Sequence, residues 1–433
     1  MDAAPSIPPR RLLDILNLRI QLQVLQQRRM VVQALLLRRQ QRQGRSKRRW
    51  WVKPWIERRI LFGQYETLMR EIKRECQGDF LNYLRMPPVM FYELLQRITP
   101  RIQKSERYRR PLEPGLKLAI TIRYIVTGNS YKSLQYSFRV AHNTISMFIP
   151  EVCQAIIDEY EDEVFAFPTN PDEWREVAQK YGERWNFRHT CGALDGKHVA
   201  IRNPCRSGTL YYNYKGFFSI ILLALVDADY KFMWADVGTQ GSSSDAQIFN
   251  HGPLRNGLEN DTLGLPDPEP LPHDDRPLPY FLVGDDAFPL RSWMMKPYSN
   301  RNMTNEERIF NYRLSRARRV VENTFGILAH RWRCMLGTMQ QDPDRAKIIV
   351  MAAICLHNLM RLRYPGVQNN DLDQEDEDGN HIPGAWRNDR VLQDVDAVDR
   401  GNLPNRDGKR IRTYLKHYYN SNVGSLPWQH NMI

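Results

Sequence analysis

Apolar and polar residues alternate at helical spacing near the start of the chain. Six apolar positions follow at intervals of three or four residues, broken once by Arg29; they are Ile15, Leu18, Leu22, Leu25, Val32 and Leu36. This spacing predicts an amphipathic helix over residues 12–37 with a coiled-coil-like seam. The pattern leaves open whether the seam packs on its own domain, on a partner helix or on a second copy of the chain.

Residues 64–160 are mostly helical by pattern, with breaks expected at Pro87 and Pro88, at Pro100 and at 111–115. Within this region, Leu134, Phe138 and Val140 fall on one short predicted helix. A turn is expected at 141–143, with Asn143 or Thr144 capping a second helix, although Pro150 argues against its continuity. Two short helices around a tight turn fit a helix-turn-helix, but many helical proteins contain such pairs.

From about residue 187 the pattern changes to short apolar runs. Strands are predicted at 191–201, 217–228, 231–238 and 279–289, and helices at 242–250 (with a serine cap), 304–333 and 343–364. Residues 252–277 are rich in Pro, Gly and Asp and predict a loop or insertion. This order of strands and helices indicates a layered α/β domain.

The C-terminal tail changes character again. Residues 369–380 contain six acidic side chains and few apolar ones, which predicts disorder. Further on, four apolar or aromatic residues indicate a docking helix: Tyr414, Leu415, Tyr418 and Tyr419.

Charge is concentrated at the N-terminus. Residues 1–75 hold 18 Lys and Arg against 6 Asp and Glu, so they account for nearly all of the net charge of +13. The run 38–49 suggests a phosphate-binding patch through Arg45, Lys47, Arg48 and Arg49, or a nuclear import signal. A solvated tail is the plain alternative.

Composition excludes several classes of protein. The six cysteines show no CxxC spacing, which argues against a zinc finger or a disulfide scaffold and suits a reducing compartment. No apolar run approaches the ~18 residues that a membrane span needs, so no membrane partner is expected.

Three acids stand out from the acidic background. Asp195 lies inside the apolar strand CGALDGKHVAI, Asp285 ends the strand FLVGDD, and Glu322 borders the apolar face of a helix. Alone, each has an ordinary explanation as a backbone acceptor, a turn cap or a solvated side chain. Together they suit phosphoryl chemistry with Mg²⁺ or Mn²⁺, because these ions prefer a few hard oxygen ligands and act in pairs.

An ordered set of motifs extends this interpretation. The segments GALDGKHV, YNYKGFFSI, LVDADYKF, GSSSDAQIF, LVGDDAFPL, RRVVENTFGIL and CLHNLM resemble the catalytic domain of PIF/Harbinger transposases and their domesticated nuclease relatives. Upstream, RRWWVKPW, DFLNYLRMPPVMFYELL and FRVAHNTIS are similar to that family's N-terminal half. The similarity covers roughly residues 45–365.

The resemblance implies an α/β RNase H-like core, a mixed sheet flanked by helices, after an all-α region containing the helix-turn-helix. Its acidic triad falls on Asp195, Asp285 (with Asp286 as the adjacent alternative) and Glu322, and two Mg²⁺ or Mn²⁺ ions are implied. The first strand should run beside the fourth. Expected boundaries are a basic arm at 1–60, a helical domain at 61–165, the catalytic domain at 166–365 and an acidic, partly disordered tail at 366–433.

Supporting roles follow less directly. Asp245 matches a family position and either orients the site or caps a helix. Lys197 and His198 contact phosphate or face solvent, whereas His357 and Asn358 are expected to be structural. Further expected DNA contacts are Asn143, Thr144, Lys215, Arg318 and Arg319.

The resemblance also implies partners and a location. The partners are double-stranded DNA, a Myb-like accessory protein and further copies of the chain. The expected location is the nucleus, or the cytoplasm until the accessory protein binds. Three functions stay open: an active transposase, a domesticated nuclease, and a DNA-binding regulator with inert acids.

Overall fold

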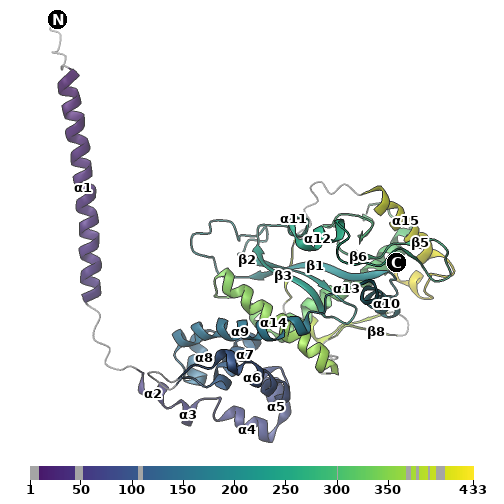
Figure 1. Cartoon of the computed structure of the whole chain (residues 1–433), viewed down its shortest axis with the longest axis horizontal. Coiled ribbons are helices and arrows are strands. Elements are labelled where there is room, and N and C mark those ends of the chain that lie inside the picture. Colours follow the sequence, from purple (N-terminus) through teal and green to yellow (C-terminus); the bar gives the residue numbers. More distant parts are fainter. Residues whose placement is uncertain are drawn as a thin grey trace. The chain divides into compact units, whose positions relative to one another are not determined.

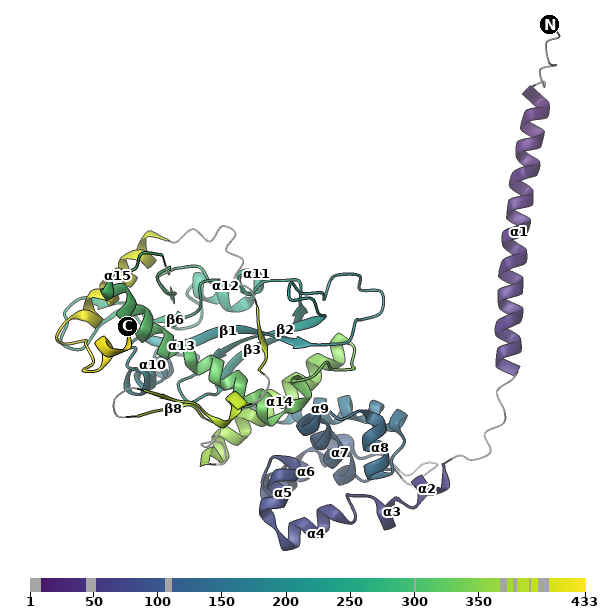
Figure 2. The same ribbon diagram turned by 180° about the vertical axis from the view of Figure 1, so that it is seen from behind.

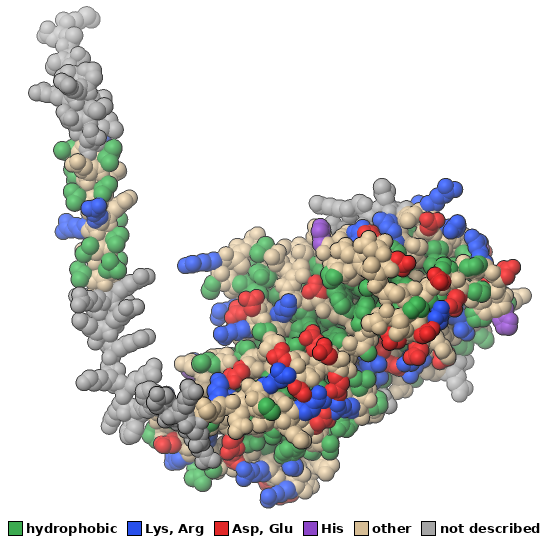
Figure 3. Space-filling view, in the orientation of Figure 1, with side chains coloured by type: hydrophobic (Ala, Val, Ile, Leu, Met, Phe, Trp, Pro, Cys, Tyr) green, Lys and Arg blue, Asp and Glu red, His purple; other side chains and the backbone are tan. Residues whose placement is uncertain are grey.

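The computed structural model describes residues 9–43, 52–105, 111–299, 301–366, 372–376, 380–388, 391–395 and 405–433. The chain divides into two compact units, Met1–Glu57 and Arg58–Ile433 (Figures 1 and 2). In the first unit, α1 (Pro9–Gln43) contains the helix expected over 12–37, and α2 (Pro54–Glu57) follows. The apolar seam from Leu18 to Leu36 is exposed within this unit (Figure 3).

The second unit begins with a bundle of helices, as expected from the sequence. They are α3 (Arg59–Phe62), α4 (Leu68–Glu75), α5 (Gln77–Leu84), α6 (Pro88–Ile102), α7 (Pro114–Thr127), α8 (Tyr131–Phe138), α9 (His142–Val164) and α10 (Pro171–Trp185). The break expected at Pro100 is wrong, because Pro100 lies inside the last turn of α6. Pro150 likewise lies inside a continuous α9, which buried contacts from Ile145 to Val164 hold in place.

Helices α8 and α9 form the pair around a tight turn that the pattern indicated. The turn lies at 139–141, two residues earlier than expected, and Arg139 adopts a left-handed conformation in it. Asn143 and Thr144 do not cap α9, since they are exposed residues of its first turn and the N-cap is Ala141. The amide of His142 instead donates to Gln135 Oε1 of α8 at 2.9 Å, so a side chain from the neighbouring helix replaces the expected cap.

A mixed sheet forms the centre of the unit. Its strands are β1 (Thr190–Ala200), β2 (Ser219–Val226), β3 (Phe232–Gln240), β6 (Phe281–Val283), β7 (Met294–Met295) and β10 (Gln393–Asp394). The order is β3-β2-β1-β6-β7, and β10 pairs with β1. Strands β1, β2 and β3 are antiparallel, whereas β6 runs parallel to β1 with Ala193 opposite Val283. The predicted adjacency of the first strand and the Asp285 strand is therefore present.

Helices cover both faces of this sheet (Figure 1). Alternate β1 residues such as Ala193 and Val199 pack in one core with α13 (Asn305–Arg331) and α14 (Pro343–Arg363). The opposite face, including Leu194, packs with α10, α11 (Asp245–His251) and α12 (Pro253–Glu259). A mixed sheet flanked by helices is the arrangement of an RNase H-like core.

Two segments expected to lack structure contain short elements. Residues 252–277 include α12 and β4 (Glu269–Pro270), which pairs with β5 (Pro277–Leu278). In the acidic stretch 369–380, the described residues contribute β8 (Gln374–Glu375), which pairs with β9 (His381–Ile382). The expected docking helix is α15 (Arg406–Asn420), whose Tyr419 is buried against Phe187 with ring centroids 5.0 Å apart.

Among the described residues, no helix is both long and apolar enough to cross a membrane. The domain boundaries within the second unit stay predictions.

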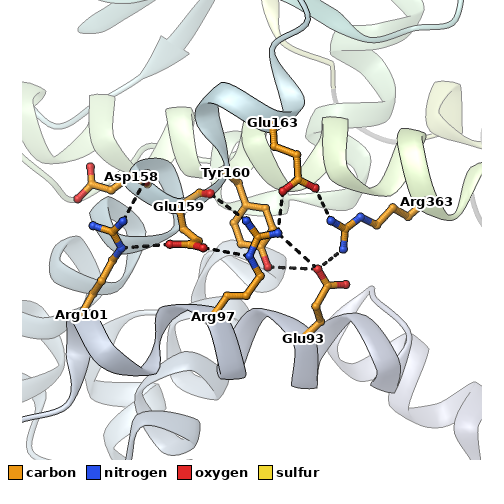
Figure 4. A network of polar contacts seen from close by, with 8 residues as sticks. All are labelled: Glu93, Arg97, Arg101, Asp158, Glu159, Tyr160, Glu163 and Arg363. Carbon is orange, nitrogen blue, oxygen red and sulfur yellow. Dashed lines mark hydrogen bonds and ion pairs between the residues drawn. The ribbon is translucent and has the colours of Figure 1, made fainter.

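An ion-pair network connects the helical bundle to the sheet-bearing part (Figure 4). Arg97 of α6 contacts Glu159 at 3.0 Å and Glu163 at 2.7 Å, both on α9, and stacks over the Tyr160 ring. Arg363 of α14 also contacts Glu163 and reaches back to Glu93 of α6. Because one cation serves several carboxylates, the three helices are held at a fixed separation.

Replacing Arg97 with Met should lower the free energy of unfolding by about 1 to 2 kcal/mol, since each ion pair contributes under about 1 kcal/mol and three glutamates, including Glu93 at 3.8 Å, lose a shared cation. Arg101→Met, which removes a more exposed arginine bound to Glu159, is the matched control and should cost less. Chemical denaturation at low and high salt measures both. Equal effects of the two substitutions, or an Arg97 effect that salt does not weaken, would contradict a central role for Arg97.

Candidate active site

Asp195 projects from the middle of β1 toward α13. Its neighbours along the strand are apolar and buried, and Asp195 itself is almost completely buried. Lys197, two residues along on the same face of β1, places its Nζ 2.9 Å from Asp195 Oδ2. The strand therefore holds Asp195 rigidly, and a lysine offsets part of the cost of burying its charge.

Asp285 lies two residues beyond the end of β6, after Gly284, so the parallel pairing of β6 with β1 brings it to Asp195 from far along the chain. The amide of Ala287 donates to Asp285 Oδ1 at 2.9 Å and fixes the carboxylate. Burial, followed by repulsion from Asp195, raises the pKa of Asp285 to about 6. The adjacent Asp286 is exposed and lies outside the pocket that Asp285 lines.

Glu322 comes to the same place from α13. Its side chain is 42% exposed, and Arg318, one turn earlier, lies 3.4 Å from Glu322 Oε1. Asp195, Asp285 and Glu322 line a single pocket of about 480 Å³, together with Lys197 and Arg318. Three acids that are far apart in the sequence are thus brought together.

The donor set of this pocket suits a hard divalent cation. All three groups offer carboxylate oxygens and none is a thiolate or imidazole. Asp285 in particular lies near another acid and is costly to ionise there, a cost that a bound cation would offset. In the described part of the chain, no three acidic, His or Cys side chains already lie close enough to form a ready-made metal cluster.

Asp245 occupies the other face of β1. It is fully buried, and neither of its carboxylate oxygens has a hydrogen-bond partner among the described residues. A Cβ at Gly196 would lie 1.9 Å from Asp245 Oδ1, so glycine is required next to Asp195. The alternative that Asp245 caps α11 is wrong, because Ser244 is the cap in a complete capping box. Burial raises the pKa of Asp245 well above its usual range.

The other residues expected to contact DNA differ in burial and in their partners. The solvent-facing alternative for Lys197 and His198 is wrong, because both are buried, and His198 Nδ1 lies 3.0 Å from Ser219 Oγ. Lys215 is exposed, whereas Arg319 pairs with Glu375 at 3.2 Å. Arg45, Lys47, Arg48 and Arg49 lie outside the described residues.

His357 and Asn358 are structural, as expected. The His357 ring contacts the Tyr230 carbonyl oxygen at 2.8 Å, and Asn358 exchanges hydrogen bonds with the backbone of Phe232. These contacts attach α14 to the start of β3.

No pattern in the sequence predicted the remaining wall of the pocket. Trp386, Arg387, Leu392 and Asp394 of the C-terminal tail line it beside the three acids. They come from a polar tail without periodicity. Only Trp386, an isolated large aromatic residue in that tail, was a signal that part of it is buried.

Comparisons with known proteins cover the region that contains this site. The model of the family described as DDE superfamily endonuclease matches residues 194–358, a range that contains all three acids. No solved structure matches the chain at a significant level.

Several curated proteins are similar to the chain. The plant protein named Protein ALP1-like, from Arabidopsis thaliana, is 25% identical over 261 residues, which cover 59% of this chain and 63% of that protein. Putative nuclease HARBI1 from Homo sapiens is 22% identical over 305 residues, covering 69% of this chain and 83% of the human protein. The match thus spans less than two thirds of the plant protein.

The ordered motifs, the matched endonuclease domain and these relatives agree. Together they support the assignment of the chain to a family of Harbinger-type DDE transposases and the nucleases derived from them.

Proposed function

We propose that this chain is a metal-dependent DNA endonuclease whose catalytic residues are Asp195, Asp285 and Glu322. The observation that carries the proposal is that a central strand, the end of its parallel neighbour and a helix direct three carboxylates into one pocket. Endonucleases of this superfamily act on DNA with divalent metal ions, which suits an all-carboxylate donor set.

Asp195, Asp285 and Glu322 would hold Mg²⁺ or Mn²⁺, as two ions. Such ions supply activation of a water or a 3′-hydroxyl and stabilisation of the leaving oxygen. Lys197 and Arg318, which now pair with two of the acids, would turn to DNA phosphates when the acids bind metal. Asp245 and Gly196 support the strand behind Asp195 and fix its position.

The full proposal is a Harbinger-type transposase that cleaves transposon ends and joins the freed 3′-hydroxyl to target DNA. The names of the relatives favour a second candidate, a domesticated nuclease that no longer transposes. A cell-based excision assay with marked transposon ends separates the two. The third candidate, an inert DNA-binding regulator, conflicts with an intact set of acids.

The remaining surfaces suggest where DNA and partners bind. Exposed Asn143 and Thr144 at the start of α9 are suited to contact DNA as part of a helix-turn-helix, and exposed Lys215 lies on the loop that joins β1 to β2. We further propose a Myb-like accessory protein, a homo-oligomer and a nuclear location. An import assay with a fluorescent fusion, with and without the accessory protein, tests the location.

Asp195→Asn, Asp285→Asn and Glu322→Gln should each reduce Mg²⁺-dependent cleavage of transposon-end duplex by roughly a thousandfold or more, as expected for groups that act as a unit. DNA binding should remain. Asp286→Asn is the matched control, because it neutralises the neighbouring acid outside the pocket, and it should cleave normally. If wild type and all variants bind DNA and none cleaves with the accessory protein present, the regulator is the better description.

Asp285→Asn should also stabilise the metal-free protein, by up to about 3 kcal/mol at about pH 8. The folded pKa of about 6 exceeds the unfolded value, so the wild type loses stability as pH rises from about 4 to about 6. The advantage of the variant should therefore shrink as pH falls through this window. Chemical denaturation in EDTA measures it, with Asp286→Asn as the control, and a pH-independent difference would argue against the buried charge.

Phosphate contacts from residues 38–59 should make DNA affinity fall steeply with salt. Replacing the arginines and lysines of 38–49 with glutamine should flatten the plot of log affinity against log salt. Fluorescence anisotropy with a labelled duplex gives the slope. An unchanged slope would assign this run to nuclear import.

A further inference from the structure

The described part of the C-terminal tail forms a strap beside α13. We define the C-terminal strap as residues 372–376, 380–388 and 391–395. Its strand β8 lies alongside α13 in both views, and Glu375 of this strand pairs with Arg316 and Arg319 of α13 (Figures 1 and 2). Farther along, Arg387 pairs with the buried Asp373 at 2.6 Å, which closes the strap on itself.

Trp386 anchors the strap in the wall of the catalytic pocket. Its side chain is almost fully buried. A Cβ at position 326 would lie only 2.2 Å from the indole of Trp386, so a side chain there would collide with it. Gly326 is one helical turn beyond Glu322, so glycine at this position lets the strap pack directly beside the third acid. Trp386 therefore attaches the strap to α13 next to Glu322.

The end of the strap reaches the first acid. Strand β10 pairs with β1 so that Asp394 lies opposite Lys197 and Gln393 opposite His198. This pairing uses the part of the β1 edge that β6 leaves open, since β6 pairs only at Thr190 and Ala193. Asp394 forms an ion pair with the ammonium group of Lys197, and the same ammonium group contacts Asp195.

The two partners of this ion pair differ in exposure. The Lys197 side chain is only 9% exposed, whereas the Asp394 side chain is 73% exposed. Asp394 therefore covers a cation inside the pocket from the solvent side. An incoming phosphate would approach Lys197 from that side and would meet a like charge there.

We propose that the end of the C-terminal strap, residues 391–395, is an autoinhibitory gate in which Asp394 holds Lys197 in place of a DNA phosphate. DNA enters when this end lifts, while Trp386 keeps the rest of the strap attached. The short β10 pairing suits a reversible contact, because two paired residues contribute few hydrogen bonds. The proposal rests on the DNA-nuclease function proposed above, since it assigns Lys197 to phosphate.

The test is a double-mutant cycle on DNA affinity without added metal, read by the anisotropy of a short fluorescein-labelled duplex. Asp394→Asn should bind roughly two- to fivefold more tightly than wild type, the range that one exposed ion pair contributes. Asp407→Asn, which removes an acid of the same tail at the start of α15, should bind like wild type. In a Lys197→Met background the gain from Asp394→Asn should vanish, because no cation is left to release.

Hydrogen exchange gives a second measurement. Amides of 391–395 should lose protection when DNA is added, whereas amides around Trp386 should not. Equal or weaker binding by Asp394→Asn, a gain that persists without Lys197, or unchanged exchange at 391–395 would each overturn the gate.

Failure of the gate is distinguishable from failure of the nuclease. If the gate is wrong, wild type still cleaves with Mg²⁺ and Asp195→Asn does not. If no variant binds DNA under any condition, both proposals fall.

Discussion

The structure around the pocket has to offset the free-energy cost of holding several carboxylates close together in a partly buried site. Asp195 and Asp285 repel each other across adjacent strands, and Asp245 is enclosed behind them without a hydrogen-bond partner in the described structure. Folding alone would not favour such a cluster, since each charge loses hydration and lies near others of its sign. The packing and the cations around the carboxylates therefore have to hold this unfavourable cluster together.

Rigid packing supplies most of that constraint. The parallel pairing of β1 and β6 places Asp285 next to Asp195. Helix α13 positions Glu322, because its apolar face packs on the sheet. Cations then offset the remaining charge, Lys197 at Asp195 and Arg318 at Glu322. A site built on strands and a helix in this way directs the three acids into one pocket, as catalytic positioning requires.

The sequence predicted what depends on local pattern and failed where distant residues decide. The apolar runs of β1 and β6 and the face of α13 are local, so the three acids could be placed on their elements. The cap of α9 depends on Gln135 of another helix, and Pro150 is tolerated because the packing of α9 outweighs one lost hydrogen bond. Asp394 was missed because its partner, Lys197, is nearly 200 residues away and its own segment has no periodicity.

The pairing of cations with catalytic acids has a thermodynamic consequence under the proposed function. A metal ion held by Asp195 and Glu322 would compete with Lys197 and Arg318 for these acids, and would leave the two cations available to phosphate. Phosphate that binds the two cations in turn frees the acids for metal. Each ligand therefore raises the affinity for the other by the same factor, because binding linkage is reciprocal. The same ion pairs that offset the charge of the acids would thus couple metal binding to the presence of DNA.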